Sequence, residues 1–254
     1  MRQLFPGAGG GDLDAGQLAG LYAYPAAAAT GRPWVRANMV ESVDGAASVD
    51  GRSGGLSGDA DRLIFRVLRS LADVVLVGSG TVRDEHYRPA QAFTMVPGLR
   101  AGRTATPPIA VVTGRLDLDL STSLFTEAPA DARTIVITGE KAPSGRRAAA
   151  AAQADVIVAG ADHVDLGGAL SALAERGLRR VLCEGGPHLL AQLAAAGRLD
   201  ELCVTVSPLL SGGAAGRILA GPELLGGLSL TLGHVLEDQG FLLCRYLARP
   251  ADVA

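Results

Sequence analysis

The chain has 254 residues, of which 48% are hydrophobic and 19% charged, and its formal net charge is −3. This composition excludes an intrinsically disordered chain and offers no basic surface for nucleic acid. Its three cysteines lie too far apart for a CxxC metal pair, and no apolar run approaches the roughly 20 residues that span a bilayer. We therefore expect a cytoplasmic protein without a bound metal, a nucleic-acid partner or a membrane anchor.

The amino-terminal part of the sequence divides at about residue 31. Residues 1–31 are rich in Gly, Ala and Pro and predict a loose arm with one helical turn, whereas 32–254 predict a single domain. Residues 34–40 alternate between apolar and polar side chains, which is typical of a strand, and the turn dipeptide Asp44-Gly45 follows them. Apolar residues over 63–71 recur at near-helical spacing and predict a helix.

The middle of the chain combines a long loop with alternating strands and helices. A short apolar strand, 74–77, precedes the stretch 87–108, which holds four prolines and no periodicity and predicts a mobile loop. Beyond this loop, strands alternate with helices, which favours a parallel sheet. The expected strands are 109–113, 134–138, 155–159 and 179–183, and the expected helices are 144–153, 165–176 and 187–196.

The end of the chain changes character. Three strands are expected at 202–206, 229–236 and 241–246, and no helix separates the last two, which predicts an antiparallel edge hairpin. The fold class is therefore α/β, with three layers and a mixed, mostly parallel sheet that carries a carboxy-terminal antiparallel edge hairpin.

Two segments share one plan, in which an apolar strand is followed by a glycine turn and the start of a helix. Gly78-Ser79-Gly80-Thr81 ends the first segment and Gly185-Gly186-Pro187 ends the second. Glycine lets the backbone approach a ligand, and free N–H groups at a helix start favour phosphate. Either turn alone favours a plain strand–helix connection, but two of them at strand ends favour a phosphate-bearing ligand.

Other candidate residues also follow strands. Thr113 and Arg115 follow the strand 109–113, where Arg115 either binds the 2′-phosphate of NADPH or is a solvated arginine on a turn. Asp44 and Glu184 each end an apolar strand, and a carboxylate placed there can orient a heterocycle or relay a proton. For Asp44 the spacing alone favours an ordinary Asp-Gly turn.

Several short runs resemble, in the same order, those of a known family. They are Arg32-Pro33-Trp34-Val35, Ser42-Val43-Asp44-Gly45, Gly78-Ser79-Gly80-Thr81-Val82, Glu184-Gly185-Gly186-Pro187 and Leu199-Asp200-Glu201-Leu202. Over about residues 33–247 the chain resembles the reductase domain of the riboflavin-pathway deaminase/reductase. The resemblance implies a dihydrofolate-reductase-like fold, NADPH as hydride donor, a homodimer, and a ribosylamino-pyrimidine phosphate as the small heterocyclic substrate.

The resemblance also implies roles for individual residues. The implied cofactor contacts are Gly78, Gly80, Thr81, Glu85, Thr113, Gly185, Gly186, Pro187, His188 and Leu189. The implied substrate contacts are Ser53, Arg69 and Glu184, with Asp44 beside the strand that faces the nicotinamide. We predict that Asp44 and Glu184 are the catalytic pair, because they would orient the heterocycle.

The chain departs from the family in two places. It lacks the HxE and PCxxC motifs of a zinc deaminase, so we expect it to supply only the reduction. After Val82 it reads Arg83-Asp84-Glu85-His86-Tyr87-Arg88-Pro89, where the family has Asp-Asp-Pro-x-Leu and then an arginine for the substrate phosphate. Arg88 is a candidate replacement at a shifted position. Reduction of a pterin such as dihydrofolate and a non-catalytic nucleotide-binding role remain the alternatives.

Overall fold

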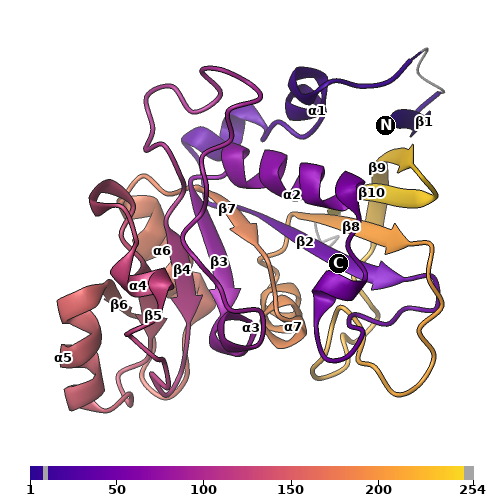
Figure 1. The fold of residues 1–254 in the computed structure, drawn as a ribbon. Helices are drawn as coiled ribbons and strands as arrows, with labels where there is room; N and C mark the ends of the chain where they lie inside the picture. Colours follow the sequence, from indigo (N-terminus) through magenta and orange to yellow (C-terminus); the bar gives the residue numbers. More distant parts are fainter. Residues whose placement is uncertain (8–10, 249–254) are drawn as a thin grey trace.

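The computed structural model describes residues 1–7 and 11–248, and within these ranges ten strands form one sheet (Figure 1). The strand order is β1-β9-β10-β8-β2-β7-β3-β4-β5-β6. The strands are β1 (Arg2–Phe5), β2 (Trp34–Ser42), β3 (Val74–Gly78), β4 (Ile109–Val112), β5 (Ile135–Thr138), β6 (Asp155–Val158), β7 (Arg180–Cys183), β8 (Glu201–Ser207), β9 (Leu230–Asp238) and β10 (Phe241–Ala248). The helices are α1 (Ala15–Leu21), α2 (Asp59–Leu71), α3 (Ser79–Asp84), α4 (Ser123–Thr126), α5 (Ser144–Gln153), α6 (Leu166–Glu175) and α7 (Pro187–Ala195).

The sheet is parallel from β8 to β6 and antiparallel from β8 to β1. This arrangement confirms the predicted mixed, mostly parallel sheet and the hairpin of β9 and β10. The hairpin does not end the sheet, however, because β1 pairs with β9 on its outer side. The carboxyl ends of all the parallel strands lie at one edge of the sheet, which is where open α/β sheets bind ligands.

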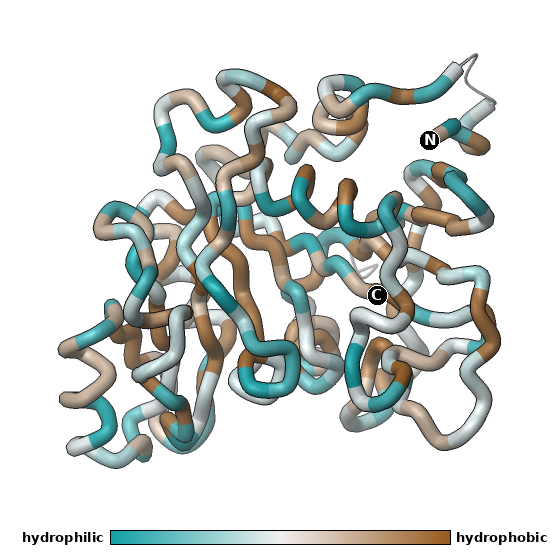
Figure 2. The backbone as a smooth tube through the Cα atoms, viewed as in Figure 1, coloured by the Kyte–Doolittle hydropathy of each residue, from teal (hydrophilic) through white to brown (hydrophobic). Residues whose placement is uncertain are grey.

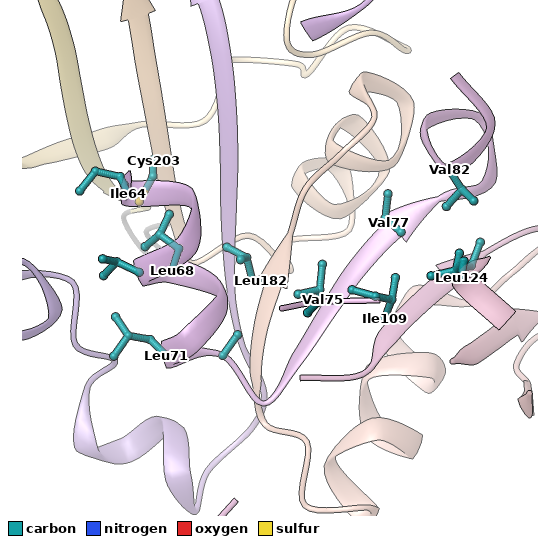
Figure 3. Packing of buried hydrophobic residues seen from close by; sticks show 14 of the residues in the cluster. Ile64, Leu68, Leu71, Val75, Val77, Val82, Ile109, Leu124, Leu182 and Cys203 are labelled. Atoms are coloured by element: carbon teal, nitrogen blue, oxygen red, sulfur yellow. The ribbon is translucent and has the colours of Figure 1, made fainter. Parts of the chain in front are cut away.

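Helices cover both faces of the sheet, as the three-layer prediction requires. Successive side chains of β3 point to opposite faces, so Val75 and Val77 join one buried cluster while Val74 and Leu76 join the other. The first cluster packs under α1, α2, α4 and α5, and Figure 3 shows Ile64 and Leu68 of α2 in it. The second lies under α6 and α7. In Figure 2 the central strands are accordingly hydrophobic and α3 is hydrophilic.

The amino-terminal segment is packed against the domain, unlike the loose arm expected from composition. A capping box between Asp14 and Gln17 begins α1, and Leu18 and Tyr22 are buried in the first cluster. The predicted helical turn is present, and the packing was not predicted because the buried face of α1 consists of only a few residues among abundant Gly and Ala. The division of the chain at residue 31 stays a prediction.

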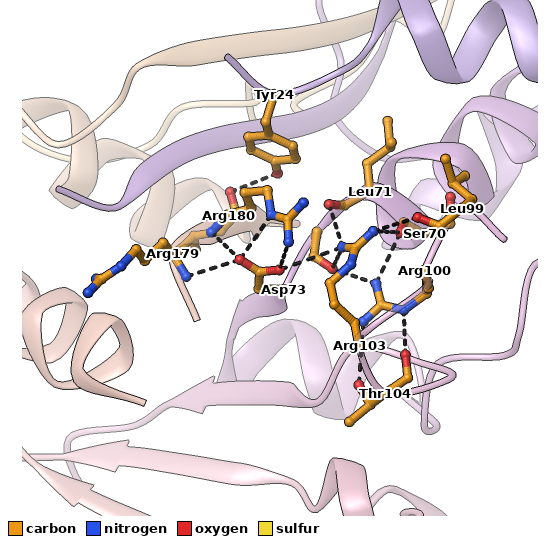
Figure 4. Close-up of polar contacts among 12 residues, drawn as sticks. Tyr24, Ser70, Leu71, Asp73, Leu99, Arg100, Arg103, Thr104, Arg179 and Arg180 are labelled. Carbon is orange, nitrogen blue, oxygen red and sulfur yellow. Dashed lines mark hydrogen bonds and ion pairs between the residues drawn. The ribbon is translucent and has the colours of Figure 1, made fainter. Parts of the chain in front are cut away.

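The loop 87–108 is attached to the end of α2 by two arginines (Figure 4). Arg100 donates to the carbonyls of Ser70 and Ala72, at 3.0 and 2.5 Å, and Arg103 donates to Leu71 at 3.0 Å. These carbonyls lie at the carboxyl end of a helix, where the helix itself supplies no donors. These bonds attach the second half of the loop to the domain, and the mobility expected for 87–108 stays a prediction.

Two kinds of feature are absent from the residues that the structure describes. Among them, no helix is both long and apolar enough to cross a membrane. In the same part of the chain, no group of three or more His, Cys, Asp or Glu could hold a metal ion.

Candidate active site

The two glycine turns predicted from the sequence lie side by side, because β3 and β7 are neighbouring strands. The Gly78 amide donates to the Gly185 carbonyl at 2.8 Å. A Cβ placed on Gly186 would lie 2.6 Å from the Thr81 hydroxyl, and Gly185 has a φ of +79°. Glycine is therefore required at both positions by close approach and by backbone conformation.

A large cavity of about 1240 Å³ opens in front of these turns. Among the predicted cofactor residues, those that line it are Thr81, Glu85, Gly186, Pro187 and His188. All three predicted substrate residues, Ser53, Arg69 and Glu184, line it as well. The structure thus brings residues from α2, the two glycine turns and the loop after β2 into one site.

Glu184 is the polar centre of the cavity. Its side chain is 2% exposed, and Arg69 donates to it twice, from Nε to Oε1 and from Nη2 to Oε2, both at 2.7 Å. The hydroxyl of Tyr87 donates to Oε2 at 2.6 Å. This bidentate pair with a third donor holds the carboxylate in one orientation.

The neighbours of Glu184 respond electrostatically to it. Burial alone would lower the pKa of Arg69, but the Glu184 carboxylate outweighs burial, and the pKa of Arg69 is raised. Burial and the same carboxylate both raise the pKa of Tyr87, so its phenol stays protonated and donates. The ring of Phe65 lies 4.2 Å from the Arg69 guanidinium carbon and supports it from the other side.

Tyr87 is a site residue that the sequence did not reveal. It lies in the aperiodic stretch where the chain departs from the family, and no pattern distinguished it from a solvent-exposed loop residue. Arg88, proposed as a replacement phosphate ligand, also lines the cavity.

Ser53 and Glu85 contact each other. The Ser53 amide donates to the Glu85 carboxylate at 2.7 Å, which joins the loop after β2 to the end of α3. Sequence resemblance assigned one residue to the substrate and the other to the cofactor. Their contact places the two predicted subsites next to each other.

Some predicted cofactor residues do not line the cavity. Thr113 is buried, and its hydroxyl accepts a hydrogen bond from the Leu116 amide at 3.1 Å. Arg115 is exposed on the turn after β4, and Leu189 is buried in the cluster under α7. Gly78, Gly80 and Gly185 lie in the turns behind the cavity surface. Cofactor contacts at these positions stay predictions.

Asp44 also lies outside the residues that line the cavity. Its exposed carboxylate accepts hydrogen bonds from the Ser42 hydroxyl at 2.5 Å and from the amides of Ser211 and Gly212 at 3.1 and 2.7 Å. The Ser42 hydroxyl and then these amides lower the pKa of Asp44 to about 2. Asp44 is therefore ionised near neutral pH and would have to accept a proton before it could donate one. Its predicted catalytic role stays untested.

Several arginines line the cavity besides Arg69. Arg62 pairs with Asp59 at 2.8 Å. Three others, Arg66, Arg88 and Arg217, have no side-chain partner in the part of the chain that the structure describes. Arginine forks bind phosphate and carboxylate groups, so the cavity suits an anionic ligand.

Comparison with known proteins shows the family to which the chain belongs. Residues 33–241 match the family model described as the RibD C-terminal domain. The chain belongs to this family. The resemblance found in the sequence is thereby confirmed, and the matched range contains both glycine turns and Glu184.

Relatives of this RibD C-terminal domain protein include two named 2,5-diamino-6-ribosylamino-4(3H)-pyrimidinone 5′-phosphate reductase. The one from Archaeoglobus fulgidus is 30% identical over 185 residues, which cover 72% of this chain and 83% of that protein. The one from Methanothermobacter thermautotrophicus is 30% identical over 193 residues, which cover 76% and 85%. The riboflavin biosynthesis protein RibD of Mycobacterium tuberculosis is 30% identical over 185 residues, but these cover only 44% of its length.

Solved structures share the fold. A pyrimidine reductase-like protein from Corynebacterium diphtheriae superimposes with a TM-score of 0.79 at 25% identity, covering 94% of this chain and 100% of the other. RibD of Acinetobacter baumannii gives a TM-score of 0.72 at 23% identity, covering 88% and 60%. The second likeness concerns the fold alone.

Proposed function

We propose that the protein is an NADPH-dependent oxidoreductase that reduces a ribosylamino-pyrimidine phosphate in riboflavin biosynthesis. The names of the relatives from Archaeoglobus and Methanothermobacter support this substrate class. One observation carries the proposal: the two glycine turns meet beside Glu184 in a single cavity. This arrangement provides a place for a cofactor next to a place for a heterocycle.

The glycine turns fit a dinucleotide cofactor. Gly186 leaves no room for a Cβ, and it precedes Pro187 at the start of α7, where backbone N–H groups are free to bind phosphate. Thr81, Gly186, Pro187 and His188 would hold NADPH at the surface of the cavity. When bound, NADPH supplies the hydride.

The residues around Glu184 would orient the substrate. Arg69 and Tyr87 fix the carboxylate, so Glu184 presents a hydrogen-bond acceptor of defined direction to the N–H groups of a planar ring. Alignment of the ring with the hydride donor can lower the reaction barrier by several kcal/mol, up to about 7–11. We assign ring orientation to Glu184 and proton delivery to water, because Asp44 is ionised and outside the cavity lining.

One set of measurements tests the proposed function. NADPH is titrated against the protein by fluorescence, and NADPH oxidation is then followed by absorbance with the pyrimidine phosphate and, separately, with dihydrofolate. We expect NADPH binding and oxidation with the pyrimidine phosphate. If NADPH is oxidised with dihydrofolate but not with the pyrimidine phosphate, the substrate is a pterin and the proposed substrate is wrong. If NADPH binds but neither compound causes its oxidation, the protein is a non-catalytic nucleotide-binding protein.

We also propose that the protein is a cytoplasmic homodimer. Apolar side chains are exposed near the carboxyl ends of β2 and β8, where Leu210 is 75% exposed, Val43 61% and Leu242 37%. The Val43 amide donates to the Leu209 carbonyl, and Leu242 is paired with Val206 of β8, so the backbone brings these segments close together. Light scattering of the Leu242→Arg variant tests this proposal, because a dimer through these exposed side chains would dissociate.

A further inference from the structure

The segment after β8 is hydrogen-bonded along the segment after β2. We call residues 208–217 the 208–217 loop. The Val43 amide donates to Leu209 at 3.0 Å, and the Ala47 amide donates to Gly216 at 2.8 Å. Between these two points, Asp44 accepts from the amides of Ser211 and Gly212. Asp44 is thus the one side chain in these contacts, and it binds the middle of the loop.

The 208–217 loop leads directly to the cavity. Gly216, Arg217 and Ala220 line the cavity wall, and the Ala220 amide donates to the Pro187 carbonyl at 3.2 Å. The segment after β8 therefore extends from its contact with Asp44 to its contact with Pro187. Pro187 is the first residue of α7 and one of the predicted cofactor residues. A change in the position of the loop would move Arg217 relative to both predicted subsites.

The loop cannot fix its own conformation. Gly212 and Gly213 have φ values of +62° and +68°, and nothing lies within 4 Å of the Cβ position of either residue. Glycine loses more conformational entropy than any other residue when it is ordered. External bonds must therefore hold this part of the loop, and the described structure shows Asp44 supplying two of them.

We propose that Asp44 is a positioning residue, which holds the 208–217 loop so that Arg217 binds a phosphoryl group of the ligand in the cavity. This inference rests on the proposed function, which supplies phosphorylated ligands. Arg217 lines the cavity, is exposed, and has no side-chain partner among the described residues. Its guanidinium fork is therefore available to a phosphoryl oxygen pair.

The phosphoryl group has two possible sources, the diphosphate of the cofactor and the phosphate of the ribosyl substrate. Arg217→Met removes the charge and keeps much of the side-chain volume. Loss of NADPH affinity in the fluorescence titration would identify the cofactor. An increased KM for the pyrimidine phosphate with unchanged NADPH affinity would identify the substrate.

The kinetic test compares Asp44→Ala, Asp44→Asn and Arg217→Met. Because a charged hydrogen bond is lost, we expect the affected KM or Kd to rise about tenfold in Asp44→Ala and Arg217→Met, with kcat changed less than about twofold. Asp44→Asn keeps one side-chain oxygen acceptor, so its KM or Kd should lie between the values of wild type and Asp44→Ala. The double variant should be no worse than Arg217→Met, since Asp44 acts through Arg217.

Matched controls are available in the chain. Asp50→Asn changes an exposed aspartate of the same segment after β2, and Arg147→Met changes a half-buried arginine on α5, outside the cavity lining. Both should behave as wild type. A kcat that falls in Asp44→Asn with unchanged KM would overturn the proposal in favour of a direct catalytic role. Additive losses in the double variant would overturn it as well.

Amide hydrogen exchange on the protein without ligand separates this inference from the proposed function. Exchange across the 208–217 loop should be faster in Asp44→Ala than in wild type and Asp50→Asn. Unchanged exchange would overturn the positioning role even if the enzyme is active. Conversely, absence of NADPH binding in the wild type, with faster exchange in the variant, would refute the proposed function and the ligand role of Arg217 while leaving the attachment of the loop intact.

Discussion

Arginines at the two ends of the sheet differ in what satisfies their N–H groups. At the amino end, Arg100 and Arg103 donate to carbonyls at the end of α2, and Arg180 donates twice to Asp73, at 2.6 and 3.0 Å (Figure 4). At the carboxyl end, Arg66, Arg88 and Arg217 line the cavity without a side-chain partner in the described part of the chain. The same residue type is thus structural at one end and available to a ligand at the other.

The amino-end arginines show the electrostatic consequence of this difference. Burial and the neighbouring guanidinium of Arg103 lower the pKa of Arg100 to about 10, and burial also lowers the pKa of Arg103. Positive charge is crowded there because several guanidinium groups surround the single carboxylate of Asp73. The carbonyls at the end of α2 compensate for this crowding, so most side-chain donors of Arg100 and Arg103 are used within the protein.

Arg69 lies between the two classes, since it lines the cavity and is paired with Glu184. The largest expected effect follows from breaking this pair. Glu184→Gln should lower kcat/KM about 100-fold, because the heterocycle loses its charged acceptor and Arg69 is left without its carboxylate. NADPH oxidation measures the effect, and Glu140→Gln is an exposed control. Activity within twofold of wild type would refute the assignment of Glu184.

The amino-end arginines should affect stability. Arg103→Ala should lower the free energy of unfolding by about 2–3 kcal/mol, because several carbonyls at the end of α2 lose a charged donor. Urea denaturation measures the change, with Arg147→Ala as the control. If the variant loses ligand affinity and keeps wild-type stability, the distinction between the two classes of arginine is wrong.

The unpartnered arginines should show the opposite behaviour. Arg88→Ala and Arg66→Ala should each weaken binding of the phosphorylated substrate about tenfold, while the free energy of unfolding stays within about 0.5 kcal/mol. Kinetics and urea denaturation on the same preparations provide the comparison. Equal KM values for the variants and wild type would show that these arginines are only solvated.

The smallest effect is expected for Arg115, which belongs neither to the arginines at the amino end of the sheet nor to those that line the cavity. It is exposed after β4 and outside the cavity lining, yet it follows a strand end. If it binds the 2′-phosphate, Arg115→Ala should raise the Kd for NADPH about fivefold and leave the Kd for NADH unchanged. Equal losses for both cofactors would contradict that assignment.

The sequence predicted elements and strand ends well, because both depend on local patterns. The strands from 34–40 to 179–183 all correspond to observed strands, with ends that differ by a few residues. The glycine turns and Glu184 were found because they directly follow buried strands. Thr113 and Arg115 follow the same rule, but the cavity does not extend to them. Position at a strand end is therefore not sufficient to place a residue in the site, and Arg69 of α2 shows that it is not required either.

The remaining features depend on contacts between distant segments. Tyr87 reaches Glu184 across 97 positions of the chain, and Asp44 reaches the 208–217 loop across 167 or more. No periodicity encodes such pairs, so the sequence indicated a turn or a strand-end carboxylate for Asp44 without its contact to the loop, and nothing distinguished Tyr87. For α1 the sequence predicted only one helical turn, since its short apolar face is obscured by surrounding Gly and Ala.

The pairing of β1 with β9 has a consequence for solubility. Without β1, the nine-residue strand β9 would present unpaired N–H and C=O groups along a sheet edge, a surface on which another chain can add a strand. Arg2 strengthens this cover by pairing with Glu237 of β9 at 2.7 Å. At the opposite edge, β6 has only four residues and begins with the charged Asp155, which discourages the same addition. By covering the edge of β9, β1 thus hinders edge-to-edge aggregation.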